Sequence, residues 1–236
     1  MKLQRDTKMR LKPILCVLVL AALAMPVYGQ VTAEDWVNKG AALAILGEFD
    51  EALQAFDEAI RLDPKATVAW YNKGLTLVYL GKFNEAIQAY DEAIRLDPGD
   101  AWAWNDKGAA LTILGEFDEA LQAFDEAIRL DSRFALAWNN KGNALSDLGN
   151  YSEAIQAYDE AIRLDPEFAW PWNGKGDTLS DLGNYSEAIQ AYDEAIRLDP
   201  GYALAWNNKG LAYRALGLHA EADAALARAN EIQAGR

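Results

Sequence analysis

The sequence has little of the chemistry on which most enzymes and metalloproteins depend. It contains one cysteine, Cys16, and one histidine, His219, so it offers neither a disulfide framework nor a cluster of soft metal ligands. It has no H-E-x-x-H motif and no glycine-rich phosphate loop. Carboxylates are plentiful but evenly spread, whereas a glycosidase-like pair needs two acids in one shaped cleft. We therefore expect no catalytic residue, no cofactor and no enzymatic activity.

Basic residues are scarce outside the N-terminus. The chain has 22 Lys and Arg against 36 Asp and Glu, and the first 29 residues hold five of the basic residues and one of the acidic ones. The rest therefore carries 17 basic and 35 acidic residues, a net charge of -18. Such a surface repels phosphate backbones, so we expect no nucleic-acid partner.

The basic N-terminus precedes an apolar run that is short for a membrane span. Residues 14–25 are twelve apolar residues, fewer than the roughly 20 that a bilayer-spanning helix needs. Pro26 and a cleavage-compatible segment ending at Gly29 follow. This order is typical of a secretory signal peptide, so we predict one at 1–29, a linker at 30–32, and an exported protein, secreted or associated with the cell envelope. The alternative is an uncleaved anchor, which would tether the protein to a membrane.

From residue 33 onward the chain is a tandem repeat with a period of 34 residues. The string DLGNYSEAIQAYDEAIRLDP stands at 147–166 and returns letter for letter at 181–200. A W-x-x-K-G pattern marks every copy, first at 36–40. The six copies predicted from this spacing span 33–66, 67–100, 101–134, 135–168, 169–202 and 203–236.

Each copy carries the signals of two helices. In the first copy Gly47 suits a left-handed helix end, and the second helix stops before Pro. A helical projection places Trp36, Gly40 and Leu43 on one core-facing stripe, with Gly40 opposite Ala52. The expected N-caps of the second helices are Asp50, Asn84, Asp118, Ser152 and Ser186.

These features resemble the tetratricopeptide repeat, a helix–turn–helix unit of the same length. In the first copy Trp36, Gly40, Ala52, Phe56 and Pro64 stand at motif positions of that family. Every copy departs from it by a lysine at the seventh position, where leucine is usual. The resemblance implies an all-α, right-handed superhelical solenoid of helix–turn–helix repeats. It also implies a non-enzymatic protein–protein interaction scaffold that binds peptide segments of a partner protein in a concave groove.

The resemblance further implies that the second, fifth, ninth, twelfth and thirteenth positions of each copy line that groove. These positions are mainly apolar or aromatic in the early copies and carry amides and acids in the later ones. We predict a ligand with apolar side chains over the first half and a basic or amide-rich stretch over the second. The alternative is that packing buries the apolar half against itself. The predicted peptide-binding residues are Tyr71, Leu75, Tyr79, Trp102, Asn105, Asn139, Asn143, Asp147, Asn173, Asp177, Asp181 and Asn207.

Three further features of the sequence carry weaker expectations. Asn150 and Asn184 begin Asn-Tyr-Ser strings that fit the glycosylation pattern, although Asn and Ser are also ordinary turn residues. Calcium binding at the acids of the fourth and fifth copies is disfavoured, because no ligand loop joins them. The competing function is a structural or assembly component of the cell envelope, formed by end-to-end repeat stacking. Self-association would then use the uncapped end of the last copy, at Leu226, Ala229 and Ile232.

Overall fold

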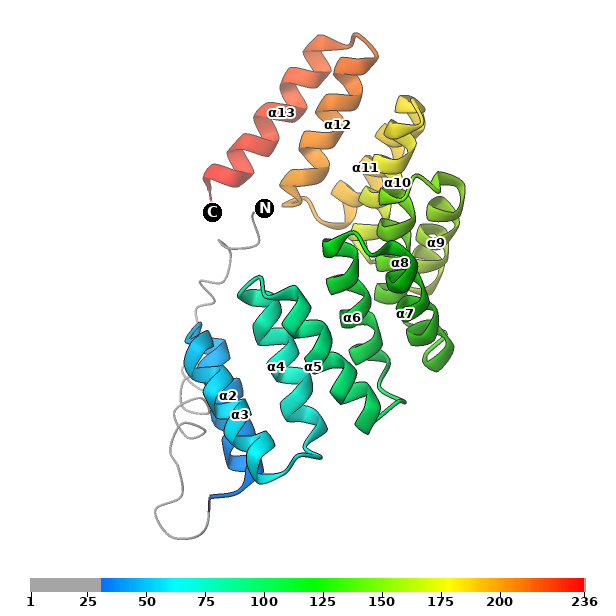
Figure 1. The fold of residues 1–236 in the computed structure, drawn as a ribbon. Helices are drawn as coiled ribbons and strands as arrows, with labels where there is room; N and C mark the ends of the chain where they lie inside the picture. The colour runs from blue at the N-terminus through cyan, green and yellow to red at the C-terminus, as the bar shows by residue number, and fades with distance from the viewer. Residues whose placement is uncertain (1–30, 236) are drawn as a thin grey trace. The chain divides into compact units, whose positions relative to one another are not determined.

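The computed structural model describes residues 31–235, and every regular element in that range is an α-helix (Figure 1). The predicted all-α fold class is confirmed, while the predicted signal peptide at 1–29 lies outside the described residues. The helices are α2 (Ala33–Leu46), α3 (Phe49–Leu62), α4 (Thr67–Tyr79), α5 (Phe83–Leu96), α6 (Ala101–Leu114), α7 (Phe117–Leu130), α8 (Ala135–Asp147), α9 (Tyr151–Leu164), α10 (Ala169–Asp181), α11 (Tyr185–Leu198), α12 (Ala203–Ala215) and α13 (His219–Ala234).

The helices fall into two compact units, α2–α6 (unit 1) and α7–α13 (unit 2), and each is described by itself. Within a unit, the two helices of a pair contact each other, as α2 and α3 do. The second helix also contacts the first helix of the next pair, as α3 contacts α4, and successive first helices contact one another, as α8 contacts α10. A helix inside a unit, such as α4, which contacts α2, α3, α5 and α6, therefore has neighbours on more than one side, which a two-helix hairpin alone would not provide.

The turn between the helices of a pair is set by the end of the first helix. Gly47 adopts the left-handed conformation with φ of 81°, as predicted, and the backbone N–H of Glu48 donates to the carbonyl of Leu43. The second helix then begins at once, at Phe49. The predicted side-chain caps at Asp50, Asn84, Asp118, Ser152 and Ser186 are therefore wrong, because these residues lie inside the first turn of their helices.

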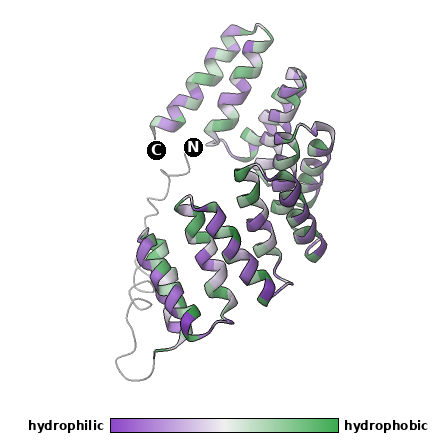
Figure 2. Ribbon diagram, in the orientation of Figure 1, coloured by the Kyte–Doolittle hydropathy of each residue, from purple (hydrophilic) through white to green (hydrophobic). Residues whose placement is uncertain are grey.

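Glycine allows the two helices of a pair to approach closely. A Cβ atom on Gly40 would lie 2.6 Å from Cε1 of Phe56. We expected Gly40 to lie opposite Ala52, but its nearest neighbour across the helix pair is the Phe56 ring. The same contact joins Gly142 to the ring of Tyr158. These rings are almost fully buried, and Figure 2 shows that most helices carry hydrophobic and hydrophilic residues on different parts of their surface. None of the helices in residues 31–235 is long and apolar enough to cross a membrane.

The lysine at the seventh position joins successive helix pairs. Nζ of Lys73 on α4 lies 2.7 Å from Oδ1 of Asp57 on the preceding helix α3, and 5.4 Å from the centre of the Trp70 ring. We call this arrangement of Trp, Lys and the preceding Asp the lysine bridge. It combines an ion pair with a cation–π contact around a partly buried ammonium. Four more bridges follow at Lys107–Asp91, Lys141–Asp125, Lys175–Asp159 and Lys209–Asp193.

Candidate functional site

The first helices of the pairs carry an exposed row of side chains, which we call the first-helix face. In unit 1 this face is apolar: Tyr79 is 63% exposed and Trp102 is 54% exposed, with Val68 and Ile113 exposed as well. The predicted site residues Tyr71 and Leu75 are half-buried and pack against the core cluster that contains Tyr90. Tyr79 and Trp102 are thus accessible to a ligand, whereas Tyr71 and Leu75 mainly contact the core.

The predicted asparagines at the fifth position do not lie on this exposed row. Asn105, Asn139 and Asn173 are only 1%, 3% and 4% exposed, and Asn207 is half-buried. The amide of Asn105 donates to Asp106, that of Asn139 to Asn140 and that of Asn207 to Asn208. A side chain that meets a peptide backbone must be open to solvent, so Asn105, Asn139 and Asn173 leave the candidate site.

The reason is the register between successive first helices. Within each unit, a fifth position of one first helix faces the sixth position of the next first helix. In unit 1 the hydroxyl of Tyr71 donates to Oδ2 of Asp106 at 2.8 Å, and in unit 2 the amide of Asn208 approaches Oδ1 of Asn173 at 3.4 Å. Burial raises the pKa of Asp106 above its ordinary value. The fifth position therefore belongs to the seam between helices.

Asp177 is the centre of a polar network in unit 2. Its carboxylate accepts hydrogen bonds from the hydroxyl of Tyr192 at 2.8 Å, from the amide of Asn208 at 2.8 Å and from the amide of Asn173 at 2.9 Å. Burial nevertheless raises the pKa of Asp177 to about 6, because removing the carboxylate from water outweighs the three hydrogen bonds, and the charge of Asp181 adds to the rise. Near neutral pH this is a mostly ionised carboxylate without a cationic partner among residues 31–235.

The structure brings the other predicted acids near Asp177. Asp147 and Asp181 are both exposed, and the pKa of Asp147 is raised by partial burial and by the charge of Asp181. The predicted residue Asn143 is also exposed and accepts a 2.9 Å hydrogen bond from the hydroxyl of Tyr158. Asp147, Asp177 and Asp181 thus form an acidic patch on α8 and α10. Among the described residues, no group of acids, histidines or cysteines is placed to hold a metal ion.

A pocket of about 300 Å³ opens beside Asp177. Its polar lining contains Asp177, Ser180, Asp181 and Asn208, and α11 and α12 supply the remaining wall. The sequence placed Asp177, Asp181 and, at the twelfth position, Ser180 on the predicted groove, but it gave no prediction for Tyr192 or Asn208. Aligning the copies would have given a signal, because the sixth position and the buried aromatic of the second helix both change between copies.

The predicted glycosylation sites and the predicted self-association end of the last copy both lie in described parts of the chain. Asn150 and Asn184 are exposed at the turns before α9 and α11, so glycosylation there stays a prediction. At the end of the last pair, Ala229 is buried, and the side chain of Leu226 lies against Gly210 of α12. Those two residues are engaged within their own pair.

Family profiles match almost all of the described part of the chain. Profiles described as tetratricopeptide repeat match residues 33–66, 71–133, 135–168, 157–190 and 203–235, and one described as TPR repeat matches 176–217. A search of curated proteins gives no match.

Solved structures share the fold. MamA is 28% identical, with 69% of this chain and 95% of that chain covered and a TM-score of 0.59. YrrB, described as a TPR protein with an unusual peptide-binding site, is 26% identical, with 73% and 89% covered and a TM-score of 0.59. PilW, a type IV pilus biogenesis factor, is 19% identical, with 82% and 90% covered and a TM-score of 0.75, and it shows the fold alone. The repeat spacing, the paired helices and these matches together establish that the chain belongs to the tetratricopeptide repeat family, whose members generally serve as protein-interaction scaffolds.

Proposed function

We propose that the chain is a non-enzymatic scaffold that binds extended segments of partner proteins on the first-helix face of each unit. In this proposal a lysine or arginine of the partner enters the pocket beside Asp177. The observation that carries it is a half-buried carboxylate, Asp177, which has a raised pKa, is open to a pocket and lies next to a second, exposed carboxylate, Asp181. An ionised carboxylate that is partly removed from water carries a desolvation cost. Pairing with a cation lowers that cost, so such a carboxylate favours a cationic ligand.

The size and polarity of the pocket favour one basic side chain over a small-molecule ligand. Its volume of about 300 Å³ lies at the lower limit of pockets that enclose a drug-sized molecule. Asp177 and Asp181 supply the charge, while Ser180 and Asn208 offer hydrogen-bonding groups at the same opening. A guanidinium or ammonium group fits this lining, since several oxygen acceptors converge on it.

The first-helix face of unit 1 supports an apolar or aromatic ligand segment. Tyr79 lies stacked against Phe49, with ring centres 5.4 Å apart, and still exposes most of its surface. Trp102 and Val68 are comparably exposed. Exposed aromatic groups that gather on one face mark interaction sites more often than they decorate an inert surface. YrrB, which has the same fold and an unusual peptide-binding site, is consistent with this use of the fold.

The test is binding of short synthetic peptides to the purified chain, measured by isothermal titration calorimetry. A set of twelve-residue peptides carries lysine, arginine, norleucine or glutamate at one central position among apolar neighbours. We expect the basic peptides to bind and the glutamate peptide to fail. Asp177→Asn should weaken the basic peptides by at least about tenfold. Glu153→Gln, which removes one exposed charge from α9 outside the pocket, is the matched control. Equal affinity for lysine and norleucine peptides would refute the proposal for the pocket.

We also propose that the protein is exported, with residues 1–29 removed. The support is the basic start, the short apolar run and the small residue at Gly29. The mass of the protein isolated from its source decides this. A chain that begins at Gln30 supports export with cleavage, and an intact N-terminus excludes cleavage.

A further inference from the structure

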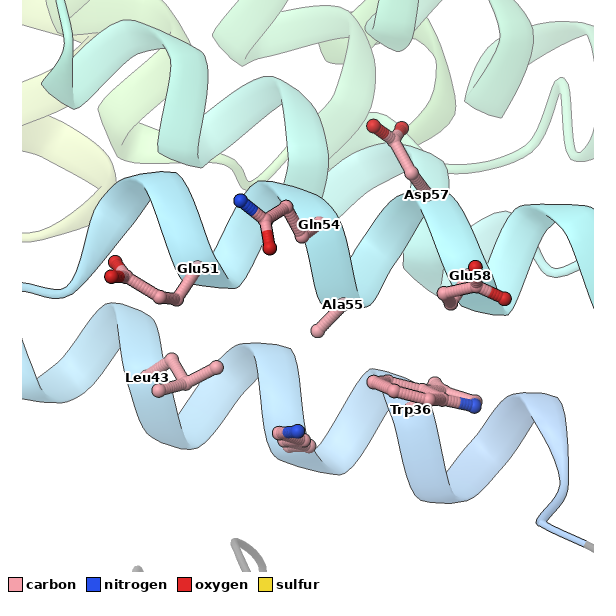
Figure 3. Close-up of a pocket in the computed structure, with 8 residues that line it drawn as sticks. Trp36, Leu43, Glu51, Gln54, Ala55, Asp57 and Glu58 are labelled. Carbon is pink, nitrogen blue, oxygen red and sulfur yellow. The ribbon is translucent and has the colours of Figure 1, made fainter.

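The surface at the N-terminal end of unit 1 is equivalent to a surface of the next helix pair that the preceding helix α3 covers. A pocket of about 600 Å³ lies over α2 and α3, and Figure 3 shows Trp36 and Leu43 on one helix facing Ala55 and Glu58 on the other. Lys39 also lines this pocket, with Nζ 4.7 Å from the centre of the Trp36 ring. We call this surface the N-terminal socket.

The next helix pair contains the same set of residues. Trp70, Lys73, Leu77 and Ala89 occupy the positions of Trp36, Lys39, Leu43 and Ala55. There the socket is filled by α3. Asp57 of α3 pairs with Lys73 at 2.7 Å, and Leu53 of α3 packs against the cluster that contains Leu77 and Ala89.

The occupants of the other sockets share a two-residue signature. Each has an aliphatic residue followed four positions later by aspartate, which places both on one side of a helix. In unit 2, Leu121 packs against the cluster beneath Trp138 while Asp125 bridges to Lys141. Ile155 and Asp159 of α9 serve the following pair in the same way.

The N-terminal socket has the tryptophan, lysine and leucine of this contact, but no preceding helix among residues 31–235 supplies the aliphatic residue and the aspartate. The core cluster beneath it contains Leu43 and Ala55, and only Trp36 and Ala44 pack on it among residues 31–235. Lys39 pairs with no carboxylate in that part of the chain, whereas each equivalent lysine does. The socket therefore presents the half-buried Trp36 and Lys39 above Leu43 and Ala55, which are only 7% and 1% exposed. Its rim also carries the carboxylates of Glu51, Asp57 and Glu58.

We infer that the N-terminal socket binds an amphipathic helix of a partner protein that carries a leucine or isoleucine and, four residues later, an aspartate. This interaction is separate from the one proposed for the first-helix face. The aspartate would pair with Lys39 over the Trp36 ring, and the aliphatic side chain would pack against Trp36 above Leu43 and Ala55.

This chain does not supply the occupant itself. The last helix, α13, has Asp223 and Ala227 where the other second helices have the aliphatic residue and the aspartate, so a second copy stacked end to end would lack both groups. Residues 1–30 contain a single acid, Asp6, and lysine stands four positions before it. Neither α13 nor residues 1–30 carry the signature, so we assign it to a partner protein.

The probe is a lactam-stapled, fluorescein-labelled peptide with the sequence of Phe49–Leu62, and fluorescence anisotropy measures its affinity for the full chain. We expect binding, and a peptide of the sequence His219–Ala234, which lacks the signature, should not bind. Replacing the aspartate that corresponds to Asp57 by asparagine should weaken binding about tenfold, the scale of one ion pair with its cation–π contact. Lys39→Met should cost the same, while Lys65→Met, an exposed lysine outside the socket, should have no effect.

A charge exchange separates recognition from folding. Lys39→Glu should bind a peptide with lysine at the Asp57 position better than it binds the original peptide, and circular dichroism should show unchanged helicity. Equal affinity of the aspartate and asparagine peptides, or of the wild type and Lys39→Met, would overturn the inference. Dimers of the chain alone in light scattering that Lys39→Met abolishes would also overturn it, in favour of a second copy. Asp177→Asn should leave this binding unchanged, so failure here is distinguishable from failure of the peptide-binding proposal.

Discussion

The hydroxyl of Tyr192 donates a 2.8 Å hydrogen bond to Oδ1 of Asp177, whereas Tyr90, which holds the same position in α5, has a buried hydroxyl without a partner among residues 31–235. The difference originates at the ninth position of the copy, which is aspartate in α10 and leucine, Leu75, in α4. In α8 that position is Asn143, and it accepts a hydrogen bond from Tyr158. A tyrosine is therefore satisfied in this fold only when the facing first helix supplies an acceptor.

Removal of the two hydroxyls should have opposite consequences. Tyr192→Phe leaves a buried carboxylate with one donor fewer, so we expect a loss of about 1–3 kcal/mol of stability. Tyr90→Phe removes an unsatisfied buried group and should be neutral or stabilising. Urea denaturation followed by circular dichroism measures both. A loss of similar size in Tyr90→Phe would contradict this account of the two sites.

Asp177→Asn should separate stability from binding. The amide avoids the cost of burying a charge that three neutral donors do not repay. We expect thermal stability at pH 7 that equals or exceeds that of the wild type, together with loss of affinity for basic peptides. Differential scanning calorimetry and titration calorimetry on the same preparation measure the two quantities. A marked drop in melting temperature would show that the charge of Asp177 stabilises the fold.

The raised pKa of Asp177 predicts the direction of a pH dependence. Its ordinary value is 3.8 and its value in the folded protein is about 6, so between these two values the folded state binds more protons than the unfolded state. Stability should therefore fall as pH rises from about 4 to about 6, by roughly 3 kcal/mol for this one group, and change little above pH 7. The pKa values of the paired surface carboxylates Glu126 and Glu160 are lowered, so these groups change stability with pH in the opposite direction. The wild type must therefore be compared with Asp177→Asn at each pH. The difference between the two curves should vanish near pH 4. Affinity for a basic peptide should rise over the same range.

Two glycines should resist substitution for different reasons. In Gly142→Ala the new Cβ would lie 2.6 Å from Cε1 of Tyr158, and forced repacking of this kind costs about 1–3 kcal/mol. In Gly149→Ala the new Cβ would have no atom of residues 31–235 within 4 Å, but φ is 85°. The left-handed conformation costs about 1–2 kcal/mol for a residue with a Cβ. Ala144, which is already alanine in the same helix, shows that the helix itself accepts a methyl group. Chemical denaturation of the two variants gives the losses, and Tyr158→Ala should relieve the first penalty and not the second. Relief of both would contradict the assignment.

The sequence predicted the helices well because their signals are local. Gly47 and its equivalents end the first helices in the left-handed conformation, as their position in each copy indicates. The expected caps such as Asp50 failed because the hydrogen bonds of the preceding helix end already fix where the next helix begins. That constraint belongs to the turn as a whole and not to any single residue type.

The candidate site was predictable only in part. Tyr79 and Asp181 are exposed as the helical projection implies, because exposure at the thirteenth position depends on one helix alone. Asn173 is buried because the sixth position of the next first helix, Asn208, covers its side of the helix. That register comes from packing between copies, which the helical projection of one copy cannot contain.

The lysine bridges also bear on how such a chain grows. Each one joins a donor near the start of one copy to an acceptor near the end of the copy before it. A tandem duplication of any copy except the last, which has Ala227 at the aspartate position, therefore brings one donor and one acceptor to the new junction, and the flanking junctions stay complementary. The gene can gain or lose whole copies without a compensating mutation. The identical strings at 147–166 and 181–200 are what a recent event of this kind leaves behind.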